Sequence, residues 1–137
     1  MATILITGAS GLIGSALSRA LSSQGHSVHH LGRTTRSSTN ARSFVWDPPR
    51  GVMDPAALNG VSHIVHLAGA GIADKRWSEA RIRDLIESRT LGPKLLHEAC
   101  SRSGHWPQSF VSAAGIGFYG AQTTDHVFIE KDAPGTD

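Results

Sequence analysis

Three glycines near the start of the chain have the spacing of a phosphate-binding turn. The apolar run 4–6 precedes Gly8, Gly11 and Gly14, and a helix-forming stretch begins at once. This order predicts a buried strand, a tight turn and a helix N-terminus, where free N–H groups and the helix dipole attract a pyrophosphate. We expect Gly8 to permit the turn, Gly11 to let the backbone approach the phosphates, and Gly14 to allow close packing. The pattern predicts dinucleotide binding.

Strand-like and helix-like stretches alternate along the rest of the chain. The expected strands are 4–6, 27–31, 43–46, 63–67 and 108–113, and the expected helices are 12–24, 55–58 and 78–104. Because strands that alternate with helices pair in parallel, we predict an α/β fold with a doubly wound, Rossmann-type parallel sheet. About five strands in the order 3-2-1-4-5 would put the glycine turn at the carboxyl edge, where the order reverses and ligands bind.

The end of the second expected strand carries a basic residue. An acidic side chain there would pair with the ribose of NAD, whereas a basic one suits the 2′-phosphate of NADP. This chain has Gly32 and Arg33, and Arg33 lies 19 residues past Gly14 with no acidic residue before Asp47. Because a guanidinium is a bidentate, permanently charged phosphate partner, we predict NADP in preference to NAD. A solvated loop arginine is the alternative interpretation.

A turn of small residues follows the fourth expected strand, at Leu67, Ala68 and Gly69. Little side-chain bulk stands there, so the backbone can approach the adenine and ribose edges of a nucleotide. Alone, the segment would pass for an ordinary turn. Beside the glycine motif it is predicted to be part of the same site.

Composition argues against several classes of partner. The chain has 137 residues, 18% of them charged, and a formal net charge of only +2, so we expect one globular domain without nucleic-acid binding. Its single cysteine, Cys100, allows no intrachain disulfide. We find neither a signal-peptide pattern nor a membrane-length apolar run, and therefore expect a cytoplasmic protein without a membrane partner.

Eight histidines raise the question of a metal site. His29 and His30 are adjacent on an expected strand, so their side chains point to opposite faces and cannot chelate one ion together. No His-x-x-x-His pair falls on an expected helix, and the sequence has no Cys/His cluster. We predict no metal site and expect His66 to be a packed core imidazole.

Several segments together resemble a known family. They are ITGASGLIG (6–14), Trp46-Asp47-Pro48, HLAGAGIADKRW (66–77), IESR (86–89) and VSAAGIGFYG (111–120). On these motifs the chain is similar to extended or atypical short-chain dehydrogenases/reductases, and within them to the NAD(P)-dependent epimerase/dehydratase-like "epimerase family". The similarity covers essentially the whole chain. Family members are roughly twice as long, so residues 1–137 resemble an N-terminal NAD(P)-binding Rossmann domain that stops before the substrate lobe. The expected core is 1–114, followed by a loop-rich segment, 115–137.

The resemblance also implies roles for individual residues. Family members hold the pyrophosphate on the positions of Ser10, Gly11, Leu12 and Ile13. They hold the 2′-phosphate near Gly32 and Arg33, and further parts of the cofactor with the backbone of Leu67 and Ala68.

Two polar positions of the long expected helix are also implied as cofactor-binding. These are Arg89, where the wider superfamily usually has Asn, and Asp84. From chemistry alone, both would pass as charges on a helix surface.

The catalytic residues are less well defined. Short-chain reductases usually combine a Tyr acid/base with a Lys four residues on and a Ser that orients the substrate carbonyl. The single tyrosine is Tyr119, and position 123 is threonine, so the chain has no Tyr-x-x-x-Lys pair. Ser112 lies where the family's Ser region begins, and a buried strand hydroxyl is its alternative interpretation. For Tyr119, pocket lining and simple packing are both open.

These features predict the NADP(H)-binding domain of an atypical short-chain reductase or epimerase-like oxidoreductase, acting on an unknown small-molecule substrate. Two alternatives stay open: a non-catalytic, NADP-sensing regulatory module, and an inactive truncated product. The long expected helix also leaves a homodimer open.

Overall fold

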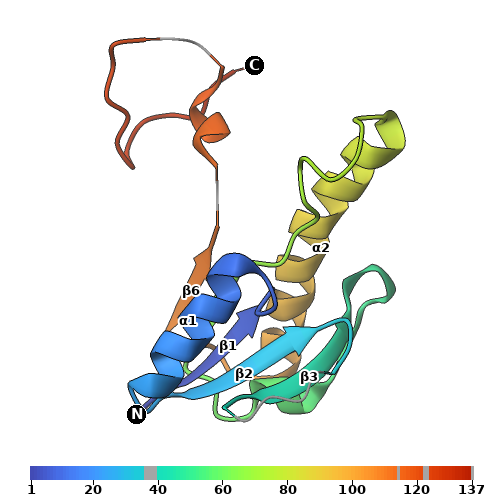
Figure 1. Ribbon diagram of the computed structural model, residues 1–137, viewed down its shortest axis with the longest axis vertical. Coiled ribbons are helices and arrows are strands. Elements are labelled where there is room, and N and C mark those ends of the chain that lie inside the picture. Colours follow the sequence, from blue (N-terminus) through green and yellow to red (C-terminus); the bar gives the residue numbers. More distant parts are fainter. Residues whose placement is uncertain (36–39, 114, 122–123, 137) are drawn as a thin grey trace.

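A computed structural model describes residues 1–35, 40–113, 115–121 and 124–136 of the chain. In this part, one sheet has the order β4-β3-β2-β1-β5-β6 (Figure 1). Its strands are β1 (Thr3–Thr7), β2 (Ser27–Gly32), β3 (Arg42–Asp47), β4 (Val52–Met53), β5 (His63–His66) and β6 (Ser109–Ser112). The helices are α1 (Leu12–Ser23) and α2 (Glu79–Ser103), with 3-10 turns η1 (Pro48–Arg50), η2 (Pro55–Leu58) and η3 (Ile116–Tyr119).

The predicted order of the parallel strands is confirmed. β2 and β5 flank β1, while β3 and β6 pair in parallel farther out. The short strand β4 was not predicted. It pairs antiparallel with the end of β3, because the two prolines of η1 and the left-handed Gly51 (φ 66°) turn the chain back on itself. The fold is a doubly wound, Rossmann-type α/β sheet.

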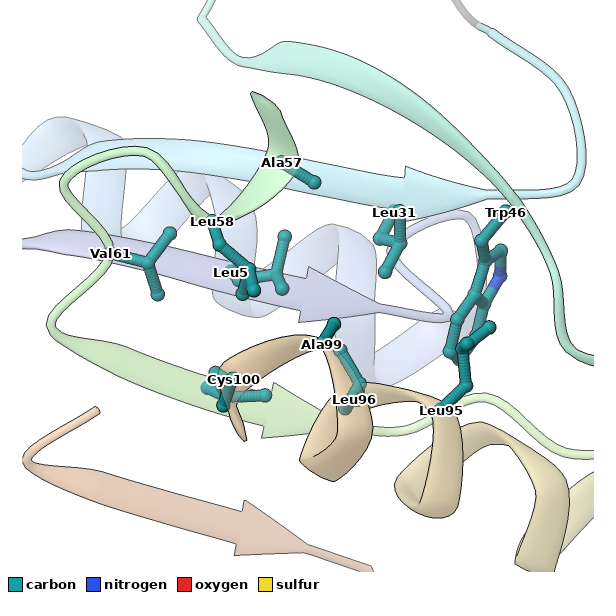
Figure 2. Packing of buried hydrophobic residues seen from close by; sticks show 11 residues of the cluster. Leu5, Leu31, Trp46, Ala57, Leu58, Val61, Leu95, Leu96, Ala99 and Cys100 are labelled. Atoms are coloured by element: carbon teal, nitrogen blue, oxygen red, sulfur yellow. The ribbon is translucent and has the colours of Figure 1, made fainter. Parts of the chain in front are cut away.

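The helices cover opposite faces of the sheet (Figure 1). α1 packs Leu17 and Leu21 against one side of β1 and β2. The C-terminal half of α2 packs on the other side, with Leu96 and Cys100 against Leu5 of β1 (Figure 2). Alternate residues of β1 therefore face different helices, and both faces of this central strand are buried, as expected for a parallel sheet.

The apolar positions of α2 differ in burial. Leu85, Leu95, Leu96, Ala99 and Cys100 are buried, whereas Ile82 and Ile86 in the first half are exposed. Figure 1 shows the first turns of α2 extending past the carboxyl edge of the sheet, and the segment after β6 also leads away from it. The helix ends at Gly104, which has the left-handed conformation (φ 68°) common after a helix. Over the residues described, no helix combines the length and apolarity that a membrane span requires.

Candidate nucleotide-binding site

The register of the sheet brings the predicted segments to one edge. Thr7, the last residue of β1, is aligned with Leu31 of β2 and with His66 of β5. His66 is in turn aligned with Ser112 of β6. Gly8, Gly32 and Leu67 each follow directly, so the glycine turn lies between the ends of β2 and β5. This is where the strand order reverses, as the sequence predicted.

The glycine turn is too tight for side chains at two positions. Gly8 has a left-handed backbone (φ 69°), and a Cβ there would lie 2.8 Å from the Ala68 nitrogen. A Cβ at Gly14 would lie 2.7 Å from the Ala9 Cα and closer still to the Gly8 carbonyl oxygen. The Gly11 N–H closes the turn with a hydrogen bond of 3.0 Å to the Gly8 oxygen. Gly8 and Gly14 therefore have the steric roles that the sequence predicted for them.

The start of α1 is open to solvent. Its N-cap residue is Gly11, so no side chain caps the helix, and its first turn contains no acidic residue. Ser10 and Gly11 are exposed, as are Ile13 and Leu12, whose exposed fraction is 89%. A helix start of this kind offers unpaired N–H groups and positive potential to an anion. The apolar Leu12 and Ile13 lie beside that position and do not contribute to the core.

Arg33 follows β2, the strand that lies beside β1 and its glycine turn. It is exposed and comes directly after Gly32, the last residue of β2. Since β2 pairs with β1 throughout, Arg33 lies at the same edge as the turn. Arg36, a second arginine of this loop, is outside the described residues.

A hydrogen-bond network holds the small-residue turn after β5, on the other side of the glycine turn from Arg33. The Thr7 Oγ1 atom accepts hydrogen bonds of 3.1 Å from the N–H groups of both Leu67 and Ala68. The same oxygen lies 2.8 Å from Nδ1 of His66, which is buried. Burial lowers the pKa of this imidazole, so it is neutral at physiological pH. The small-residue turn is thus held against the end of β1.

Helix α2 holds the continuation of this segment. The Ala70 N–H donates to Ser88 Oγ over 3.0 Å, and the Arg89 guanidinium donates to the Ala70 carbonyl over 3.0 Å. Arg89 also lies beside Gly69, where a Cβ would be 3.5 Å from the guanidinium carbon. Arg89 is therefore brought to the predicted site.

Asp84 is engaged elsewhere. Its carboxylate pairs with the guanidinium of Arg81, and Arg81 also donates to the Gly71 carbonyl oxygen. Asp84 remains more than half exposed, whereas Arg81 is buried. In this arrangement Asp84 acts on the loop through Arg81, and its predicted contact with a cofactor stays a prediction.

The two candidate catalytic residues are not assembled into one centre. Ser112 is exposed at the end of β6, next to His66 in register. Tyr119 lies in η3, where its hydroxyl donates to the Ile129 carbonyl over 3.1 Å and its ring stacks on Phe128 at 4.6 Å. The described contacts of Tyr119 thus stay within the segment after β6.

The histidines have structural partners. His29 lies 2.9 Å from the Ala57 carbonyl oxygen on one face, and His30 lies 2.6 Å from Ser18 Oγ on the other. This confirms that the adjacent pair points in opposite directions. Within the described ranges, no three His, Cys, Asp or Glu side chains come together as a metal site. Burial raises the pKa of Cys100, which keeps its thiol protonated.

Sequence reasoning missed three residues that build this site: Thr7, Ser88 and Arg81. Thr7 is a hydroxyl residue at the end of an otherwise apolar strand, which is a usable signal for a side chain that bonds neighbouring backbone. Ser88 adjoins Arg89 in the recognised IESR segment. Nothing in the sequence around Arg81 indicates that it is buried, because its burial depends on the path of the segment 69–74, whose Gly71 carbonyl it contacts.

Comparison with known proteins agrees with this geometry. Residues 4–136 match the model of the "NAD dependent epimerase/dehydratase family". Epimerase family protein Mb2239 of Mycobacterium bovis is 38% identical over 135 residues, which cover 98% of this chain and 43% of that protein. The chain thus spans less than half the length of this curated relative.

Two solved structures are similar over nearly the whole chain. Human epimerase family protein SDR39U1 (isoform 2) with NADPH has a TM-score of 0.72 and 26% identity, covering 97% of this chain and 42% of that one. MoeE5 in complex with UDP-glucose and NAD has a TM-score of 0.75 and 28% identity, covering 96% and 42%. Relatives therefore bind either form of the dinucleotide. From the family match and the shared fold, the chain belongs to the NAD dependent epimerase/dehydratase family.

Proposed function

We propose that this chain is the NADP(H)-binding part of an epimerase-family oxidoreductase. The observation that carries the proposal is the open N-terminus of α1 beside the end of β2. Uncapped N–H groups without a nearby acid suit a diphosphate, and Arg33 at the same edge suits a 2′-phosphate. The absence of space for a Cβ at Gly8 and Gly14 is the fit expected of a backbone cradle.

Different residues would bind different parts of the cofactor. The backbone from Ser10 to Ile13 would hold the diphosphate, and Gly32 with Arg33 the 2′-phosphate. Leu67, Ala68 and Gly69 would border the nucleoside, with Arg89 behind them. When bound, the nicotinamide ring would supply hydride-transfer chemistry.

We also propose catalytic roles for Ser112 and Tyr119. Ser112 ends β6 at the nucleotide edge with its side chain exposed, so it can meet a substrate carbonyl there. Tyr119 would have to give up its bond to Ile129 before it could exchange a proton with substrate. Because the chain spans 43% of a relative's length, further catalytic and substrate contacts are proposed to come from outside these residues.

The test compares NADP with NAD by titration calorimetry. We predict that NADP binds at least about tenfold more tightly, which is roughly 1.4 kcal/mol. Arg33→Asp should reverse this order, because a carboxylate repels the 2′-phosphate and accepts from the ribose hydroxyl of NAD.

Arg42→Asp is the matched control. It makes the same change of charge at an exposed arginine, but at the first residue of β3, which is aligned with His29 in the middle of β2 and not with the end of that strand. It should preserve the preference for NADP. Equal affinities of the unaltered chain for both nucleotides would remove Arg33 from the site, and absence of binding to either would reject the proposed function.

A further inference from the structure

A buried histidine lies directly under the backbone that borders the site. His66 is 4% exposed and is the last residue of β5, so Leu67 and Ala68 follow it immediately. Its ring meets Trp46 edge-on, with centroids 6.1 Å apart, and lies parallel to Phe110 at 6.3 Å. Gly92 of α2 closes the remaining side, where a Cβ would come within 2.9 Å of the His66 Cε1 atom. The imidazole is therefore confined on all described sides.

The bonds around Thr7 determine which nitrogen of His66 carries the proton. A hydroxyl group has one proton to donate and two lone pairs to accept with. The N–H groups of Leu67 and Ala68 are donors only, and both donate to Thr7 Oγ1 over 3.1 Å; the Leu67 N–H also donates to the Thr7 backbone carbonyl oxygen over 3.3 Å. The hydroxyl proton is thus left for His66 Nδ1, 2.8 Å away. On this count we assign Nδ1 of neutral His66 as the acceptor and Nε2 as the nitrogen that carries the proton.

The Nε2 atom is buried and has no hydrogen-bond partner within the described structure. An unpaired buried donor is costly, and in a native structure it calls for an explanation. Here the unpaired N–H is at Nε2, on the side of the ring that faces Gly92, while Nδ1 is bonded to Thr7. The arrangement favours the contact with Thr7 over a second bond elsewhere.

We propose that His66 is a positioning residue of the nucleotide site: by accepting the Thr7 proton at Nδ1, it orients Thr7 to hold the Leu67 and Ala68 amides, and its protonation disrupts this arrangement and weakens nucleotide binding. The binding part of this inference rests on the proposed function. The orientation of Thr7 can be tested in the free protein.

Protonation of His66 changes the balance of donors and lone pairs at Thr7 Oγ1. Imidazolium has N–H donors at both nitrogens, so Nδ1 can no longer accept. Thr7 Oγ1 would then face three donors with two lone pairs, and its own proton would lose its acceptor. At least one of the bonds that Leu67 and Ala68 donate to Oγ1 must break, and the Leu67 N–H then still has the Thr7 carbonyl oxygen as an acceptor. Because the Ala68 nitrogen lies against Gly8, this change reaches the glycine turn itself.

Among the residues that the structure describes, none with a charged side chain is found against the ring. The residues found against it are Thr7, Trp46, Gly92 and Phe110, and none of these ionises between pH 4 and 8. The titratable groups on the α2 side of the sheet include His29, Arg89 and Cys100. His29 is bonded to the Ala57 carbonyl, Arg89 to the carbonyls of Ala70 and Leu85, and Cys100 is buried in the core.

Burial lowers the pKa of His66 from its usual 6.5, so the folded chain binds fewer protons than the unfolded chain just below pH 6.5. Its contribution to folding stability is complete above that pH and declines as the pH falls. Nucleotide affinity should decline at lower pH still, through the folded-state pKa.

The experiment pairs two substitutions at one position. The amide oxygen of His66→Asn can accept from Thr7 where Nδ1 does, yet it does not titrate, whereas His66→Leu has no acceptor. NADP affinity is measured by calorimetry from pH 7.5 to 5.0. We expect His66→Leu to lose at least about tenfold at every pH, His66→Asn to recover most of that loss, and the unaltered chain to lose affinity on acidification about fivefold more than His66→Asn. The difference from His66→Asn removes the titration of the nucleotide itself.

A second measurement needs no nucleotide. Long-range ¹H–¹⁵N NMR of the free protein should show the proton of His66 on Nε2, and amide exchange at Leu67 and Ala68 should accelerate on acidification more than in His66→Asn. A proton on Nδ1, or identical pH profiles for the unaltered chain and His66→Asn, would overturn the inference. If NADP binds to none of the variants, the proposed function fails, and the NMR result still decides whether His66 orients Thr7.

Discussion

The two helices of this domain begin in opposite ways. At α2, Ser78 Oγ accepts from the Arg81 N–H over 3.2 Å, and Glu79 places a negative charge in the first turn. At α1, the N-cap is Gly11, without a side chain, and no acid follows. One helix start is satisfied by its own chain, and the other is left to solvent.

The difference separates a structural helix end from a binding one. Compared with glycine, a Ser, Thr or Asp at the N-cap stabilises a helix by about a few tenths of a kcal/mol, so Gly11 forgoes a small amount of stability. At α1 this open start coincides with a glycine turn that has no room for a Cβ and with the ends of two neighbouring strands. We interpret the forgone cap as the place where a diphosphate substitutes for it.

The largest effect on the open start of α1 is expected from Gly14→Ala. Its Cβ would meet the backbone of Gly8 and Ala9, neither of which is the movable end of a side chain. Overpacking of this kind costs roughly 1–3 kcal/mol, against less than about 1 kcal/mol gained from helix propensity. We expect NADP affinity to fall about a hundredfold, or roughly 2.7 kcal/mol, together with a lower free energy of unfolding.

Calorimetry and urea unfolding would measure the two effects. Gly115→Ala serves as control, because a Cβ there meets nothing within 4 Å. Unchanged NADP affinity in a stably folded Gly14→Ala protein would show that the turn's geometry is irrelevant to binding.

Much of this arrangement was predictable, since it depends on local pattern. The glycine spacing fixed the turn at Gly8 and Gly14, and apolar periodicity located five of the strands and both long helices. β4 escaped detection because a two-residue strand has no period, and its pairing depends on how Pro48 and Pro49 turn the chain. Ile82 and Ile86 have the helical spacing of core residues, yet they are exposed because the start of α2 extends past the sheet.

The site was predictable only in part, for a related reason. Gly32 and Leu67 are placed by their strands, so the sequence located them. The contacts of Ser88 and Arg89 with Ala70 join residues 18 and 19 positions apart, and depend on the path of the segment between them. The periodicity of apolar residues in the sequence does not predict the path of such a segment. Asp84 illustrates the limit, since the partner that it finds is Arg81.

A smaller effect is expected from adding a negative charge at the start of α1, where α2 already has one in Glu79. Ser10→Asp places a carboxylate at the open helix start, where a negative charge favours the helix by about 0.3–1 kcal/mol. The same charge opposes a bound diphosphate. We predict a slightly more stable free protein with NADP affinity reduced about tenfold, measured by thermal unfolding and calorimetry.

Glu79→Gln is the reciprocal control at α2. Removing that carboxylate should lower stability by a few tenths of a kcal/mol and leave NADP affinity within about twofold. Tighter binding of NADP to Ser10→Asp would mean that the diphosphate does not lie at the start of α1.

The smallest effect is expected from removing the cap of α2. Ser78→Ala deletes the acceptor for the Arg81 N–H and should lower the free energy of unfolding by about 1 kcal/mol. Ser78→Asp, which can cap equally well, should preserve it. NADP affinity should stay within about twofold in both variants, because this helix start serves the chain's own backbone. If Ser78→Ala weakened NADP binding as much as Ser10→Asp, both helix starts would belong to the site, and capping would not distinguish structural from binding ends in this fold.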